Sequence, residues 1–304
     1  AFSAEFSNTG EGGDEKRIVL ADFYEPTNFI FLHEIDIIGV NPVFSHAKTE
    51  LLYGDAKAVE DGHQFVIYDI DTKKSESLWD PHHKLDVPCS GFIAVWNADN
   101  SGFFFSQPPK PFSIEQNIHS YDFSTRTINL VHYGNGYSVY PRALKGLDTL
   151  IIFSNNAVDT GHDVGHYFMD LNGNYLSRIS NPYLELVNVN GITQKGAYHI
   201  HWNDDLKLFV YSEIDSTFPG YRISITDLYG TFYKSYTTGQ YIDEHPVFGP
   251  DGKTVLFDRH ELQEVADPIK KSHLMMIDIE TGIVDEFVKP EQIGGAYSLR
   301  FPDF

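Results

Sequence analysis

The chain has 304 residues, of which 41% are hydrophobic and 14% aromatic, so it can bury a large core. Its 22 basic and 43 acidic residues give a net charge of −21, which opposes binding to the phosphate backbone of nucleic acids. No apolar stretch reaches the roughly 18 residues that a membrane-spanning helix needs, and a single cysteine, Cys89, excludes an intrachain disulfide.

One three-part pattern recurs along the chain. It consists of a large apolar residue, an aromatic residue nine positions later, and an Asp about one strand further on. The first mark falls at Phe44, Trp96, Leu144, Trp202, Phe248 and Phe301. The second falls at Tyr53, Phe105, Phe153, Tyr211 and Phe257, and the third at Asp69, Asp122, Asp170, Asp227 and Asp278. A period of about 50 residues is typical of propellers and other repeat arrays.

The incomplete copies of the pattern at the two ends of the chain complete one another. Phe301 opens a sixth copy, and Phe6 and Asp22 supply its second and third marks. Phe6 precedes Asp22 by 16 residues, as Tyr53 precedes Asp69 by 16. This predicts that a C-terminal strand joins the N-terminal strands and closes a ring.

Each copy predicts four antiparallel strands, most clearly in the last complete one. There a first strand over residues 245–253 runs into an Asp251-Gly252 turn, and further strands follow at 254–258, 274–279 and 283–288. The Asp mark is predicted to cap the turn between the third and fourth strands. We therefore predict an all-β, six-bladed β-propeller that forms a single domain over residues 1–304. The blade cores are predicted at about 39–80, 91–132, 139–180, 197–237 and 243–289, and the sixth at 296–304 together with 2–35.

The connections at the two ends of these predicted strands differ in kind. The turns between first and second and between third and fourth strands are short and polar, whereas the other connections are long and rich in His, Pro and aromatic residues. Binding residues concentrate on loops that a rigid scaffold holds in place. We therefore expect ligand-binding residues at the mouth of the central channel on the long-loop face, namely Tyr140, Arg142, Tyr198, Tyr221, Arg259 and Arg300.

A group of imidazoles falls at the same depth of the innermost strands. His199 and His201 stand two apart, which in a regular strand places them on one face, and His245 of the next copy follows Glu244. Such residues are ligands for divalent ions, which makes Mn, Zn or Ca a candidate cofactor. The alternative, that the imidazoles hydrogen-bond backbone groups between blades and bind no metal, stays open.

The run from His245 to Lys253, followed by Met276 to Gly282, resembles the WD40-like (PD40) repeat of the periplasmic protein TolB and its relatives. The resemblance implies a β-propeller and a periplasmic or secreted location. It is specific for fold alone, because this repeat occurs in binding scaffolds, in peptidase propeller domains and in polysaccharide lyases.

Two functions follow from these observations. The favoured one is a non-catalytic binding module that holds a protein, peptide or glycan partner on its long-loop face. The alternative is a metal-assisted polysaccharide (uronate) lyase, since His199, His201 and His245 are similar to the metal-binding histidines of oligogalacturonate lyases. Those lyases are larger and seven-bladed, and their metal-site Gln is matched only loosely by Gln194. No Gly-x-Ser-x-Gly motif of a serine hydrolase is present.

Overall fold

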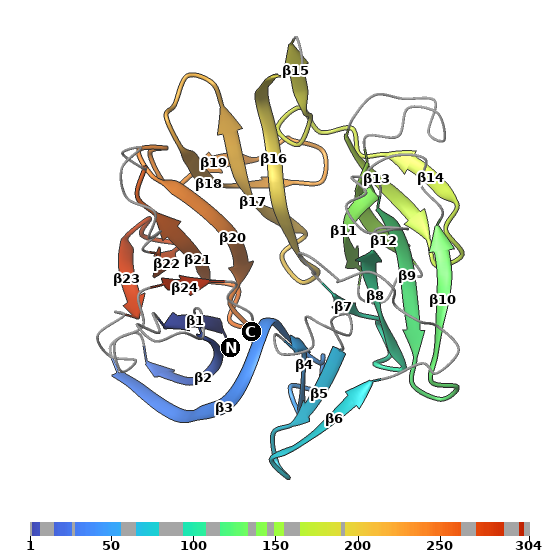
Figure 1. Ribbon diagram of the computed structural model, residues 1–304. Helices are drawn as coiled ribbons and strands as arrows, with labels where there is room; N and C mark the ends of the chain where they lie inside the picture. Colours follow the sequence, from blue (N-terminus) through green and yellow to red (C-terminus); the bar gives the residue numbers. More distant parts are fainter. Residues whose placement is uncertain are drawn as a thin grey trace. The chain divides into compact units, whose positions relative to one another are not determined.

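The computed structural model (Figure 1) describes residues 2–6, 15–25, 28–55, 65–78, 94–107, 116–132, 138–144, 149–154, 165–189, 192–262, 272–288 and 298–300. These residues form strands and turns and no helix, which confirms the predicted all-β class. It follows that no helix in this part of the chain can cross a bilayer. The chain divides into two compact units, one formed by Val43–Leu186 and the other by Ala1–Pro42 together with Val187–Phe304.

The unit of Val43–Leu186 contains three sets of antiparallel strands in sequence order. The first continues from the end of β3 (Asn28–Phe44) through β4 (Glu50–Asp55), β5 (Phe65–Asp69) and β6 (Lys74–Leu78). The second comprises β7 (Val95–Trp96), β8 (Gly102–Gln107), β9 (Asn117–Asp122) and β10 (Thr127–His132). The third comprises β11 (Ser138–Ala143), β12 (Thr149–Ser154), β13 (Gly165–Asp170) and β14 (Tyr175–Arg178).

The other unit contains the remaining strands, again joined mainly as antiparallel neighbours. One set comprises β15 (Val187–Val189), β16 (Ile192–Asn203), β17 (Leu208–Asp215), β18 (Tyr221–Asp227) and β19 (Tyr233–Ser235). The next comprises β20 (Ile242–Phe248), β21 (Thr254–His260), β22 (Ser272–Asp278) and β23 (Val284–Val288). The last comprises β24 (Ser298–Arg300), β1 (Phe2–Phe6), β2 (Glu15–Glu25) and β3.

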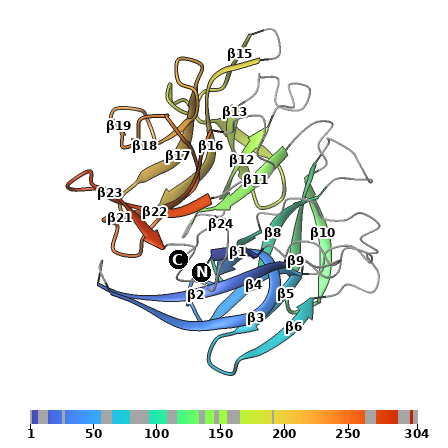
Figure 2. The ribbon, with the colours of Figure 1, turned by 60° about the vertical axis from the view of Figure 1, so that its left-hand side comes forward.

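The C-terminal strand pairs with the N-terminal strand (Figures 1 and 2). β24 runs antiparallel to β1, with Leu299 opposite Ala4, and β1 in turn pairs with β2. On its other side β24 meets β22, where Ser298 lies opposite Ser272. Phe301, the first mark of the predicted sixth copy, lies outside the described residues.

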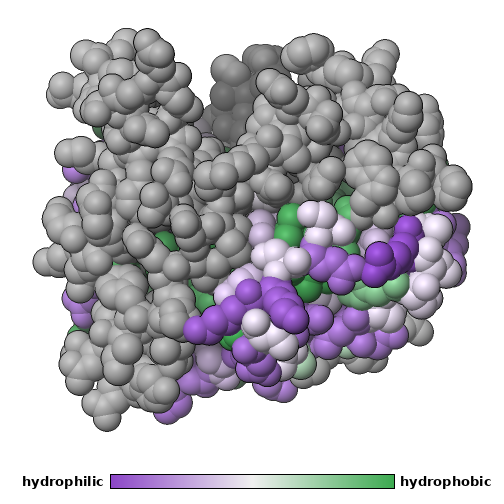
Figure 3. All heavy atoms as spheres, turned by 60° about the horizontal axis from the view of Figure 1, so that its bottom comes forward, coloured by the Kyte–Doolittle hydropathy of each residue, from purple (hydrophilic) through white to green (hydrophobic). Residues whose placement is uncertain are grey.

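The repeated aromatic residue lies in the core at every described copy. Tyr53, Phe105, Phe153, Tyr211 and Phe257 are all buried. In the unit of Val43–Leu186, Phe105 contacts the ring of Phe65 edge-on at 4.9 Å between centroids. In the other unit, Phe257 belongs to a cluster with Phe248 and Val210. The surface that the described residues present in Figure 3 is mainly hydrophilic, with smaller apolar patches between.

The repeated Asp caps the turn that follows its strand, as predicted. Oδ1 of Asp122 accepts hydrogen bonds from the backbone N–H groups of Ser124 and Thr125 at 2.8 and 2.9 Å. Oδ1 of Asp278 accepts one from Thr281 N at 2.8 Å. The hydrogen bonds of Thr72 hold the pKa of Asp69 below its usual range. The same turns contain a residue of positive φ, namely Lys73, Arg126, Gly173, Gly230 and Gly282.

Candidate functional site

Three inner strands of the unit that contains both chain ends share one backbone irregularity. His199 of β16 and His245 of β20 adopt φ values of 49° and 50°, and Asn41 of β3 adopts 53°. All three precede the first mark of their copy by three residues. The pairing register shifts between Tyr198 and His201, and in β20 at the equivalent place. Residues other than glycine seldom adopt positive φ, so these positions are β-bulges that redirect a side chain.

The bulge in β16 falls at two of the predicted metal ligands. A regular strand would place His199 and His201 on one face, and the extra residue between Tyr198 and His201 interrupts this alternation. The ring of His199 instead lies against that of His245, with centroids 4.0 Å apart and planes inclined by 31°. Nδ1 of His201 accepts a hydrogen bond from Phe248 N at 3.3 Å, which ties β16 to β20. The structure therefore brings His199 and His245 together and gives His201 a backbone partner.

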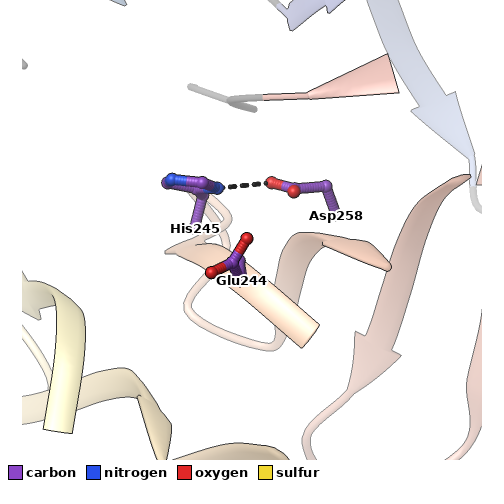
Figure 4. A group of neighbouring side chains, drawn as sticks. All are labelled: Glu244, His245 and Asp258. Atoms are coloured by element: carbon purple, nitrogen blue, oxygen red, sulfur yellow. Dashed lines mark hydrogen bonds and ion pairs between the residues drawn. The ribbon is translucent and has the colours of Figure 1, made fainter. Parts of the chain in front are cut away.

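A buried carboxylate that the sequence analysis missed lies next to His245. Nδ1 of His245 lies 2.9 Å from Oδ1 of Asp258 (Figure 4), and Nε2 of His260 lies 2.8 Å from Oδ2 of the same carboxylate. Glu244 lies opposite Asp258 in the β20–β21 pairing, and its carboxylate is 3.7 Å from Nε2 of His260. One ligand atom each of Glu244, His245 and Asp258 fall within 4.8 Å of one another. The predicted hairpin around Gly252 pairs β20 with β21, and it was the one sequence signal that could have placed Asp258 beside His245. The bulge in β20 shifts the register of this pairing, so the hairpin pattern alone did not identify Asp258.

The group combines the carboxylates of Glu244 and Asp258 with the imidazoles of His245 and His260. Burial opposes ionisation of Asp258, but the imidazoles of His245 and His260 outweigh it, so the pKa of this carboxyl lies well below its usual range. The carboxylate of Glu244 lies 3.7 Å from Nε2 of His260 and close to His245 and Asp258. Such a group of imidazoles and carboxylates can hold a cation.

Arg259, predicted as a ligand-binding residue, has partners inside the protein. Its Nε and Nη2 donate to the two carboxylate oxygens of Asp243 at 2.7 and 2.9 Å. The guanidinium lies 4.5 Å from the centre of the Tyr241 ring. Asp243 is fully buried, so Arg259 neutralises a carboxylate that has no access to solvent.

Tyr221 and Tyr198, also predicted to bind the ligand, lie near Glu244. Burial, the charge of Glu244 and the neighbouring Tyr198 raise the pKa of Tyr221. Within the described residues the hydroxyl of Tyr221 makes no hydrogen bond, and neither does the carboxylate of Glu244. Two part-buried polar groups are thus available to a ligand at this end of β18 and β20.

The structure describes the other predicted site residues only in part. Tyr140 and Arg142 belong to the unit of Val43–Leu186, where Nη1 of Arg142 donates to the carbonyl of Pro141 at 3.3 Å. The side chains of Tyr140, Arg300 and Gln194 lie outside the described part of the structure. One of the connections predicted to be long, that between β17 and β18, is short, because β17 extends to Asp215 and pairs with the start of β18 at Tyr221.

Comparisons with known proteins agree with this architecture. No protein-family model matches the sequence, and no curated protein sequence matches it. Among solved structures, TolB from Acinetobacter baumannii superposes with a TM-score of 0.71 at 15% identity, covering 100% of this chain and 65% of that one. A protein assigned as TolB in Agrobacterium tumefaciens gives 0.62 at 13% identity, covering 86% and 84% of the two chains.

The fold is that of the TolB-like β-propellers. Oligogalacturonate lyase from Vibrio parahaemolyticus has a TM-score of 0.49 at 11% identity, over 94% of this chain and 84% of that one, which is too low to support an argument. All these identities are so low that the likeness defines the fold and leaves the activity to the residues of the site.

Proposed function

We propose that this TolB-like chain forms a six-bladed ring closed by β24 and acts as a non-catalytic binding module for a protein, peptide or glycan. The proposed closure of the ring, at the seam where β24 pairs with β1, is supported by the register of the two strands, in which Leu299 lies opposite Ala4. A Cys89→Ser protein with Ala4→Cys and Leu299→Cys should form a disulfide on mild oxidation. A matched Ala4→Cys, Ser298→Cys protein should not, because a shift of one residue moves the side chain to the other face of the sheet. Equal cross-linking of both pairs would argue against the seam.

The binding site that we propose lies where β18 and β20 begin. The observation that carries it is the pair formed by Tyr221 and Glu244, whose polar groups make no hydrogen bond within the described residues. Both side chains are only partly buried, so a ligand can reach their polar groups from the surface. Tyr198 adds aromatic surface beside them. A periplasmic or secreted location fits the resemblance to TolB.

The binding module is tested by affinity enrichment from an extract of the organism that makes the protein. A partner retained by the wild-type chain should be lost with Tyr221→Ala and Glu244→Gln. It should be kept by Lys253→Glu, since Lys253 is exposed on the short turn at the other end of the same sheet, where its amino group pairs with the exposed Glu280 at 3.2 Å. A partner that is lost with Lys253→Glu and kept with Tyr221→Ala would contradict the proposed site, because it would place binding at the short-turn end of the sheet.

A second candidate function is the binding of a divalent metal ion by His199, His245 and Glu244. It is favoured by Glu244, His245 and Asp258, whose ligand atoms lie within 4.8 Å of one another, and by the ring of His199, whose centroid lies 4.0 Å from that of His245. Imidazole nitrogen with one carboxylate suits Zn or Mn better than Ca, which prefers oxygen ligands. When bound, such an ion supplies a positive charge to a carboxylate of the partner or substrate. The uronate lyase hypothesis has no other support in the structure.

Metal binding is tested by titration calorimetry and metal analysis of the dialysed protein. We expect one Zn or Mn per chain in the wild type and none in a His199→Ala, His245→Ala protein. His273→Ala is the matched control, because His273 forms a comparable pair with Glu286 at 2.7 Å elsewhere in the same unit. Full metal content in the double variant would remove this candidate.

A further inference from the structure

Two arginines, one near the start of β18 and one near the end of β21, are held in the same way inside the protein. Nε and Nη2 of Arg222 donate to the two carboxylate oxygens of Glu213 at 2.8 and 2.9 Å, and the guanidinium lies 4.3 Å from the centre of the Phe218 ring. Arg259 pairs with Asp243 in the same way and also lies over a tyrosine ring. Each arginine thus combines a buried carboxylate with an aromatic ring, which suits its planar fork of N–H groups.

A third set of a carboxylate and aromatic rings lies next to these two. Tyr221 begins β18 and pairs with Ile242 of β20, and Glu244 stands two residues further along β20 on the same face. Burial, the charge of Glu244 and the neighbouring Tyr198 raise the pKa of Tyr221, so the three side chains lie near one another. Within the described residues Glu244 makes its ion pair with His260, at 3.7 Å, and no arginine takes the place that it has in the other two sets.

A buried hydroxyl in the same sheet also has no hydrogen-bond partner within the described residues. Ser212 is fully buried, and its Oγ is the unpaired atom. Ser212 lies opposite Tyr198 in the pairing of β16 with β17, and Ile214, two residues further on, lies opposite Tyr221. The side chains of Ser212, Tyr198 and Tyr221 therefore share one face of the sheet. Buried polar groups without a partner are uncommon in native proteins, and an N–H donor of a ligand accounts for this one.

We propose that Tyr221 and Glu244 hold an arginine side chain from a peptide segment of the partner, in the way that the chain holds its own arginines. The inference rests on the binding site proposed above and names the chemistry of its partner. Glu244 accepts hydrogen bonds from the guanidinium, and the rings of Tyr221 and Tyr198 lie against its flat faces. The net charge of −21 favours the approach of a basic segment.

The inference is tested with immobilised hexapeptides whose fourth position is Arg, Lys, citrulline or Glu and whose other positions are randomised over uncharged residues. Citrulline has the shape of arginine without its charge, so the comparison of these two isolates the charge. At neutral pH and physiological salt, we expect the wild-type protein to be retained at least about 10-fold more by the Arg peptides than by the citrulline peptides, with Lys between them. Equal retention by Arg and citrulline overturns the inference, and so does retention by neither.

Two substitutions that remove the same charge locate the effect. Glu244→Gln keeps the size of the side chain, and the preference for Arg over citrulline should disappear. Glu280→Gln makes the same change at the short-turn end, where Glu280 is exposed and pairs with Lys253, and should keep the full preference. Equal loss in both variants would assign the attraction to net charge alone and overturn the inference. Tyr221→Leu removes the ring and should lower retention of the Arg peptides about 2- to 10-fold.

The outcomes separate this inference from the binding module itself. If affinity enrichment yields a partner that depends on Tyr221, but this partner is a glycan or the Arg and citrulline peptides bind alike, the site stands and the arginine is wrong. If neither the extract nor the peptides show binding that depends on Tyr221 and Glu244, both proposals are wrong. Near-ultraviolet circular dichroism checks that each variant is folded. If Glu244→Gln does not fold, the preference of the wild type and the loss in Tyr221→Leu still decide the question, because unchanged retention in Tyr221→Leu contradicts the inference.

Discussion

Substitution of Arg259 should lower the free energy of unfolding, whether or not it also weakens ligand binding. In Arg259→Met the fully buried Asp243 loses both hydrogen bonds of its partner. A buried charge without a partner destabilises a protein by about 3–5 kcal/mol. We therefore expect the free energy of unfolding in urea to fall by that amount, even though the sequence analysis assigned Arg259 to the ligand.

The double substitution Arg259→Met, Asp243→Leu provides the control for this prediction. Removing both charges and replacing them by apolar side chains is often close to neutral. Most of the lost stability should therefore return. A double variant that is as unstable as Arg259→Met would show that the ion pair is not the cause.

His166 makes the protein sensitive to acid through burial. It is 5% exposed, its Nδ1 donates to the carbonyl of Leu184 at 3.1 Å, and burial lowers its pKa from 6.5 to about 4. The unfolded chain thus takes up a proton at a higher pH than the folded protein. The contribution of His166 to the free energy of unfolding is complete above pH 6.5 and is lost as the pH falls to about 4. This loss amounts to at most about 3 kcal/mol.

Urea unfolding of the wild type and of His166→Gln between pH 7.5 and 4.5 measures this contribution. The amide of Gln can donate to the same carbonyl but does not titrate. The wild type should lose stability more steeply than the variant over this range, and parallel profiles would contradict the assignment.

At the scale of the element, Gly282 sets the turn between β22 and β23. Its φ is +76°, and an added Cβ would meet no atom within 4 Å. The cost of Gly282→Ala therefore comes from the backbone alone and should be about 1 kcal/mol in the free energy of unfolding. Gly282→Asn should lose less, because Asn tolerates this conformation better. Equal losses for Ala and Asn, measured by thermal unfolding, would count against the backbone explanation.

The elements that the sequence predicted well are those governed by local chemistry. The Asp at the end of each third strand caps its own turn, and the aromatic residue of each second strand is buried, as at Asp122 and Phe105. The bulges at His199 and His245 were not predicted, because positive φ is uncommon for any residue other than glycine and depends here on the pairing with neighbouring strands. With the bulge unknown, His199 and His201 were placed on one face.

The candidate site was predicted only in part, because the β-bulges were not predicted. Glu244, His245 and His199 stand out in the sequence as metal-ligand types, and the structure places the ring of His199 against that of His245 and groups Glu244 and His245 with Asp258. Asp258 and His260 were missed, since their contacts depend on the register of β20 on β21, which the bulge in β20 displaces from that of the predicted hairpin. The internal partner of Arg259 was missed because a side chain at the end of a strand can point to solvent or to a neighbouring carboxylate.

At the scale of the whole molecule, the central claim is that a partner binds at the end of the sheets where β18 and β20 begin. Tyr221 opens β18 at this end, whereas Tyr229, which is 73% exposed, lies in the turn that follows the same strand. The two positions are matched in residue type and belong to one strand and its turn. Probes at the two positions therefore report on the two ends of β18 and replace the same type of residue.

The most direct measurement is photo-cross-linking with p-benzoylphenylalanine placed at Tyr221 or at Tyr229, in cells that make the protein. We predict a covalent adduct with a single partner from position 221, identified by mass spectrometry, and none from position 229. Adducts from position 229 with none from position 221 would contradict the proposed site.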